Sequence, residues 1–223
     1  MDVYDRLGVT KVVIGAATLT RLGGSLMPPE VLEAMAEAAR HFVDMDELQT
    51  KVGRQIAEWT HNEAAFVSCG AAAGLALSAA VCIAGTDPEK RARLPYSEGM
   101  ANEVIVHVKN RVGYDFAMRQ AGARLVEIGD EQGASADELE GAINDRTAAS
   151  LYFYNVTHMP GLVPLEQGID IAHRRGVPLI VDAAAQIPPV ENLWRLTHAG
   201  ADLALFSGGK GLCGPQASGL ILG

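Results

Sequence analysis

The 223-residue chain is 48% hydrophobic and carries 18 lysine and arginine residues against 27 aspartate and glutamate residues, a formal net charge of -9. This balance predicts a folded domain with a sizeable core, and the lack of a large basic cluster argues against a nucleic-acid-binding surface. Three cysteines without a C-x-x-C pair argue for reduced thiols in the cytoplasm and against a metal site, while the acidic start and short apolar runs predict neither export nor membrane insertion.

Hydrophobic periodicity predicts helices that alternate with strands after a short first strand at residues 11–15. Helices are expected at residues 28–43, 46–61, from Ala71 onward, near 114–120, at 135–144 and at 165–175. Strands are expected at residues 64–68, 103–108, 123–129, 150–156, 178–183, 202–207 and 218–223. The charged stretch at residues 85–102 is expected to form a surface loop. The pattern predicts an α/β fold, a mostly parallel sheet with helices on both faces.

Two segments are expected, an amino-terminal one at residues 1–45 and a main domain at residues 46–223. The chain stops after an apolar strand that no helix follows, whereas a finished α/β domain would cover such a strand on both faces. We therefore expect the domain to be incomplete at its carboxyl end.

Lys210 stands among glycines in the stretch FSGGKG, between two apolar runs. A phosphate-binding P-loop is excluded, because Ala204 occupies the position of its first glycine and Gly211 follows the lysine. Two interpretations stay open, a surface turn with a solvated lysine and a lysine that forms a Schiff base with a carbonyl cofactor.

Asp182 is expected at the carboxyl end of the strand at 178–183, where ligands of parallel sheets bind. A carboxylate there is costly unless it meets a cation, and Lys210 follows a later strand, so the two can face one cavity. This pairing is typical of pyridoxal phosphate, in which the lysine attaches the cofactor and the aspartate keeps the pyridine nitrogen protonated. The alternative is that Asp182 caps a helix and Lys210 is solvated.

A phosphate cradle is predicted in FVSCGAAAGLALS, which combines a strand, a turn of small residues and the start of a helix. The backbone N–H groups of Gly70, Ala71 and Ala72 would point at the phosphate from the positive end of the helix dipole. The hydroxyls of Ser68 and Ser207 are further candidates.

These motifs, in this order, resemble fold-type I pyridoxal-phosphate enzymes. The stretch SGGKGLCGPQASG resembles the branch that contains selenocysteine synthase (L-seryl-tRNA(Sec) selenium transferase), and the opening VYDRLGVTKVVIGAATLTRLGG resembles the subgroup of D-glucosaminate-6-phosphate ammonia-lyase. The resemblance covers essentially the whole chain and implies that residues 46–223 are the cofactor-binding large domain, without the family's small carboxyl-terminal domain. It implies Lys210 and Asp182 as catalytic residues and a cofactor shell of Ser68, Cys69, Gly70, Ala71, Asp182, Ala184, Ser207 and Lys210.

The resemblance implies a lyase that performs α,β-elimination and releases ammonia from a small anionic amino acid or amino-sugar acid. A selenium transferase acting on seryl-tRNA, a racemase or aldolase, and a catalytically incomplete fragment are the alternatives. Candidates for contact with the substrate or the cofactor ring are Arg21, Asn110, Tyr114 and His158. The expected setting is a cytoplasmic homodimer or larger homo-oligomer without nucleic-acid or membrane partners.

Overall fold

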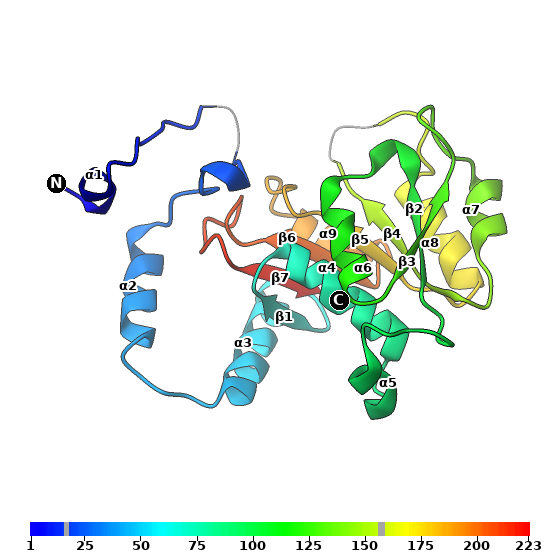
Figure 1. Ribbon diagram of the computed structural model, residues 1–223, viewed down its shortest axis with the longest axis horizontal. Helices are drawn as coiled ribbons and strands as arrows, with labels where there is room; N and C mark the ends of the chain where they lie inside the picture. The colour runs from blue at the N-terminus through cyan, green and yellow to red at the C-terminus, as the bar shows by residue number, and fades with distance from the viewer. Residues whose placement is uncertain (16–17, 156–158) are drawn as a thin grey trace.

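The computed structural model describes residues 1–15, 18–155 and 159–223. One mixed sheet runs through its centre (Figure 1). The strand order is β1 (Ala65–Ser68), β7 (Gly219–Leu222), β6 (Leu203–Ser207), β5 (Leu179–Asp182), β4 (Thr147–Phe153), β2 (Glu103–His107) and β3 (Arg124–Ile128). Neighbouring strands are parallel except at β7, which is antiparallel to both β1 and β6. The predicted mostly parallel sheet is confirmed.

Helices pack on both faces of the sheet and create two apolar layers. One layer contains α4 (Ala71–Ala84) and α6 (Phe116–Gln120), and the other contains α7 (Ala136–Ala142), α8 (Leu165–Arg174) and α9 (Asn192–His198). Residues of β2 alternate between the layers: Val104 and Val106 join the first, and Ile105 joins the second. A strand that is buried on both faces is mostly apolar along its length, so buried strands such as β2 could be predicted from the sequence.

Local capping explains where several helices begin. Asp44 accepts a hydrogen bond from the Glu47 N–H and starts α3 (Met45–Trp59), and Ser135 forms a reciprocal capping box with Glu138 at α7.

In the described residues, no helix combines the length and the apolar character that crossing a bilayer requires.

The structure corrects several expected elements. Residues 11–15 form no strand, because Val12 and Val13 are exposed and no neighbouring strand supplies backbone partners for them. The expected loop at 85–102 contains α5 (Pro88–Arg93), which Asp87 caps, and α9 was not expected at all. Short 3-10 turns also occur at η1 (Thr20–Leu22), η2 (Val108–Asn110) and η3 (Gly113–Asp115).

The amino-terminal segment lies apart from the sheet, at the blue end of the chain in Figure 1. Its helices α1 (Val3–Leu7) and α2 (Pro29–Ala38) bury no residue. The helix expected at 28–43 is shorter than predicted and ends at Ala38. Between the two helices, the Ser25 N–H donates to the Gly209 carbonyl at 2.9 Å and ties the segment to the loop that carries Lys210.

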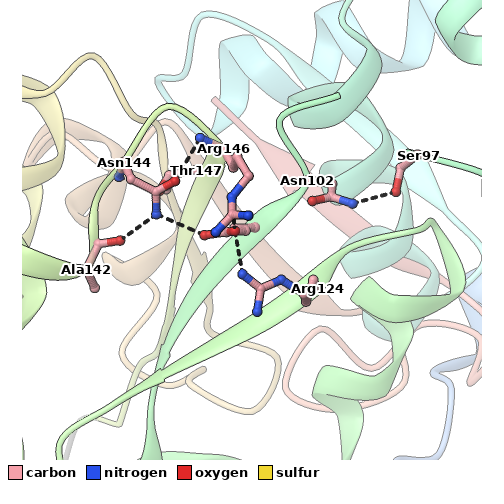
Figure 2. Close-up of polar contacts among 8 residues, drawn as sticks. Ser97, Asn102, Arg124, Ala142, Asn144, Arg146 and Thr147 are labelled. Carbon is pink, nitrogen blue, oxygen red and sulfur yellow. Dashed lines mark hydrogen bonds and ion pairs between the residues drawn. The ribbon is translucent and has the colours of Figure 1, made fainter. Parts of the chain in front are cut away.

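A buried carboxylate holds together the amino-terminal ends of three strands. Glu103, at the start of β2, is 1% exposed and pairs with Arg124 and with Arg146, the latter at 2.6 Å. Asn144 donates to the same carboxylate at 2.9 Å. Figure 2 shows the side chains of Arg124, Asn144 and Arg146 converging at this edge. These hydrogen bonds and charges lower the pKa of Glu103, although burial alone would raise it.

Candidate active site

The turn predicted to hold a phosphate lies where β1 and β6 end on either side of β7. Ser68 and Ser207 both pair with Gly219 in the sheet, one from each side. A Cβ on Gly219 would lie 2.7 Å from the Gly70 carbonyl carbon and 2.9 Å from the Ala71 nitrogen. Glycine at 219 therefore allows the turn before α4 to pack directly against the sheet.

The start of α4 offers backbone donors to an anion. Gly70 precedes the helix with φ +127°, a conformation that favours glycine, and no side chain caps the helix start. Ser68 donates from its hydroxyl to the Gly70 carbonyl at 3.0 Å, which fixes the turn. Gly70, Ala71, Ala72 and Ser207 line one cavity of about 170 Å³. An anionic group in this cavity would meet the N–H groups at the positive end of α4.

Asp182 and Lys210 line the same cavity. Asp182 ends β5 and accepts a hydrogen bond from the Ala184 N–H at 2.9 Å. Burial raises the pKa of Asp182, while this hydrogen bond and the positive charge of Lys210 oppose the rise. A buried carboxylate of this kind is suited to a ligand that brings its own positive charge.

A second cavity, of about 240 Å³, shares Asp182, Ala184, Lys210 and Tyr114 with the first. Asn110 lines the second cavity and donates to the Phe153 carbonyl at 2.9 Å. Tyr114 is 47% exposed and faces both cavities, so it is the candidate placed to cover a flat ring between them.

Other expected residues lie outside these cavities. Cys69 is exposed and lines neither cavity. Arg21 is exposed in η1, next to Thr20, which lines the first cavity. Arg111, whose guanidinium could bind an anion, is already paired with Asp115 and Glu127. His158 lies outside the described residues.

Sequence reasoning missed several residues that line the cavities, among them Thr20 and Gln216 in the first and Tyr154, Asn155 and Gln186 in the second. Arg195 also went unnoticed: it lies over the Tyr154 ring at 5.7 Å and donates to the Tyr154 hydroxyl. Among these residues, only Gln186 could have been found from the sequence, because it follows by four residues Asp182, which was expected at the end of a strand.

The residues present fit pyridoxal phosphate. One cavity at the carboxyl ends of β1, β5 and β6 is lined by three suitable groups. They are a lysine amine, a buried carboxylate that could pair with a ring nitrogen, and a helix start that could bind a phosphate. The fold and the residues around this cavity are those expected of a fold-type I pyridoxal-phosphate enzyme.

Comparison with known proteins identifies the family. Residues 23–223 match the class-V aminotransferase family, and the chain belongs to it. It is 37% identical over its full length to D-glucosaminate-6-phosphate ammonia lyase of Salmonella typhimurium, and 38% identical over 99% of its length to 5'-C-glycyluridine monooxygenase-decarboxylase of a Streptomyces species. L-seryl-tRNA(Sec) selenium transferase of Nitratidesulfovibrio vulgaris is 30% identical over 94% of the chain.

A solved structure of D-glucosaminate-6-phosphate ammonia-lyase superimposes with a TM-score of 0.93 at 36% identity, covering 100% of this chain and 60% of that one. The chain covers 60%, 56% and 47% of the three relatives named above, in that order. The family membership confirms the expected resemblance and implies pyridoxal phosphate as the cofactor.

Proposed function

We propose that the chain is the cofactor-binding part of a pyridoxal-phosphate-dependent lyase that releases ammonia from a small anionic amino acid or amino-sugar acid. The observation that carries the proposal is the placement of Lys210 and Asp182 around one cavity, in a chain 37% identical to an ammonia lyase.

Pyridoxal phosphate, when bound, supplies an aldehyde that a lysine amine can attack and a ring that withdraws electrons from the substrate α-carbon. Ala71 and Ala72 would hold its phosphate through their N–H groups, and Asp182 would accept a hydrogen bond from its ring nitrogen. Tyr114, which faces both cavities, would exclude water from one face of the ring.

Lys210 has two tasks in this proposal. Its amine would attach the cofactor, and once free it would take the proton from the substrate α-carbon as the general base. Loss of a β-leaving group from the substrate would follow, and hydrolysis of the resulting enamine would yield a keto acid and ammonia. The substrate anion would bind near Arg21 beside the first cavity or near Arg195, which contacts Tyr154 of the second.

The test is a substrate screen with several readouts. Purified protein is loaded with pyridoxal phosphate and incubated with phosphorylated and unphosphorylated amino-sugar acids and with small amino acids, and ammonia and keto acid are measured. We expect both products to form in equal amounts and Lys210→Ala to form neither.

Two relatives define the competing outcomes. Oxygen consumption with carbon dioxide release would favour oxidative decarboxylation, and selenide-dependent conversion of seryl-tRNA would favour the transferase. Because the net charge is -9, we expect seryl-tRNA neither to bind at physiological salt in a gel-shift assay nor to be converted. Either competing activity without ammonia would refute the lyase assignment.

A further inference from the structure

Gln216 faces two backbone carbonyl groups that come from opposite ends of the chain. With its amide nitrogen toward them, it donates to the Gly209 carbonyl and to the Gly23 carbonyl, each at 3.2 Å. The opposite orientation would place the amide oxygen against two acceptors, so the nitrogen faces them. Gly209 directly precedes Lys210, and Gly23 follows the η1 turn of the amino-terminal segment.

The same place is packed too tightly for any side chain at two glycines. A Cβ on Gly24 would lie 2.0 Å from the Gln216 amide and 2.2 Å from the Gly209 oxygen. A Cβ on Gly209 would lie 2.4 Å from the same amide. Gly24 also has φ +75°, which favours glycine. We call this contact of Gly24, Gly209 and Gln216 the three-way junction.

The three-way junction acts on Lys210 through one peptide plane. The Gly209 carbonyl, the Lys210 N–H and the Lys210 Cα belong to the same planar group, so hydrogen bonds that fix the carbonyl also fix the position of the Cα from which the Lys210 side chain leaves the backbone. The Gly209 oxygen accepts from Gln216 and, at 2.9 Å, from the Ser25 N–H. On the other side of the lysine, the Cys213 N–H donates to the Lys210 carbonyl at 3.0 Å.

We infer that Gln216 is a positioning residue for Lys210, and that it couples the orientation of the lysine to the docking of the Leu19–Ser25 turn. Thr20 in this turn lines the first cavity, so release of the turn would open the cavity wall as well as loosen the lysine. The inference rests on the proposed role of Lys210 as the amine that attaches the cofactor.

The experiment compares Gln216→Met, which keeps the length of the side chain but cannot donate, with Gln216→Glu, which places a carboxylate against two carbonyl oxygens. The matched control is Gln55→Met, since Gln55 is an exposed glutamine on α3. Trypsin reports the docking of the turn, because Arg21 lies within it and the exposed Arg40 lies beyond α2. The ratio of cleavage after Arg21 to cleavage after Arg40 should rise about fivefold in Gln216→Met and further in Gln216→Glu, as hydrogen bonds that hold the turn closed are lost.

The second readout is the visible circular dichroism of bound pyridoxal phosphate divided by its absorbance, which measures how firmly the lysine orients the cofactor. We expect this ratio to fall to about half or less in both Gln216 variants while the absorbance remains. Gly24→Ala should reproduce both effects, and Gly8→Ala should not, since Gly8 has a similar φ of +69° but open space around it. Adding Gln216→Met to Gly24→Ala should change little more, because both substitutions break one contact.

Two results would overturn the inference. Gln216 variants that behave like Gln55→Met in both readouts would show that the junction has no role, and faster cleavage with unchanged dichroism would show that it anchors the segment without positioning Lys210. If the wild-type chain itself gave no visible absorbance with pyridoxal phosphate, the proposed function would fail, and with it a positioning role for Gln216.

Discussion

Asp182 and Lys210 line one cavity, and the positive charge of Lys210 partly offsets the rise that burial causes in the pKa of Asp182. Burial raises the pKa of Asp182, and the Ala184 N–H and Lys210 lower it in part. Without a bound ligand, Lys210 offsets only part of the cost of burying the ionised Asp182, because the surroundings of this carboxylate favour its neutral form.

Replacing Lys210 should separate attachment of the cofactor from charge. We expect Lys210→Ala and Lys210→Arg both to lose the visible absorbance of attached pyridoxal phosphate and to lower ammonia release about 10³-fold or more, because neither side chain can form the covalent bond or act as the base. Lys210→Arg keeps the positive charge beside Asp182, so its unfolding should depend on pH as in the wild type. Persistent absorbance after borohydride treatment of either variant would point to another lysine.

Replacing Asp182 with asparagine should stabilise the cofactor-free chain and impair the loaded one. A carboxylate whose folded-state pKa is raised contributes stability below its unfolded pKa and loses it as the pH rises through the folded value, so at neutral pH its ionised form opposes folding. Thermal unfolding of Asp182→Asn should therefore shift upward at pH 7 and approach the wild type in acid. Slower exchange of the substrate α-proton would mark the cost to function, and a lower melting temperature at pH 7 would contradict the argument.

His107 should make the chain sensitive to mild acid. Its ring is 2% exposed, packs edge-on against Tyr152, and neither nitrogen has a hydrogen-bond partner among the described residues. Burial lowers the pKa of His107 to about 4. Between pH 6.5 and about 4, His107 therefore binds a proton in the unfolded chain but not in the folded one. As the pH falls across this window, the free energy of unfolding drops by up to roughly 3 kcal/mol.

The variant His107→Leu should lose that part of the pH dependence in urea unfolding measured from pH 7 to pH 4.5. It breaks no hydrogen bond to a described residue, so its stability at pH 7 should change little. The exposed His198 supplies the control His198→Leu, which should keep the wild-type acid sensitivity.

Glu103→Gln tests the far edge of the sheet. Removing the charge leaves Arg124 and Arg146 without their shared anionic partner and should lower the free energy of unfolding by about 2 kcal/mol. A larger loss is not expected, because solvent screens the charges of both arginines, which are partly exposed. Glu140→Gln is the matched control, since Glu140 pairs with Arg174 at 3.7 Å on the surface and should matter by less than about 0.5 kcal/mol. Equal losses in the two variants would remove any special role for the buried site.

Most strands, and the placement of Asp182 and Lys210 around one cavity, were predictable because their signals are local. Buried strands read as apolar runs, and Asp182 stands out as a charge at the end of one. The short helices α5 and α9 and the antiparallel course of β7 depend on contacts made by segments far apart in the chain, which no local pattern records. The same holds for Gln216, whose partner Gly23 is nearly the whole chain away.

The glycines around Lys210 show most clearly what could not be predicted from the sequence. One interpretation of them was a surface turn with a solvated lysine, but a Cβ on Gly208 would lie 2.0 Å from the Ser218 hydroxyl, and one on Gly211 would lie 2.3 Å from the Ile187 carbonyl oxygen. Glycine is needed at these positions because neighbouring groups lie so close. Composition alone cannot distinguish that need from a need for mobility.

The position of β7 also bears on the order in which the protein is made and folds. Within the described sheet β1 pairs with β7 alone, and the two strands lie about 150 residues apart in the chain. While the ribosome is still adding residues, the strands from β2 to β6 can pair and α4 can pack against β4, β5 and β6, but β1 has no strand to pair with. The turn at residues 68–71, which follows β1 and packs against Gly219, therefore reaches its final place only after β7 has been synthesised.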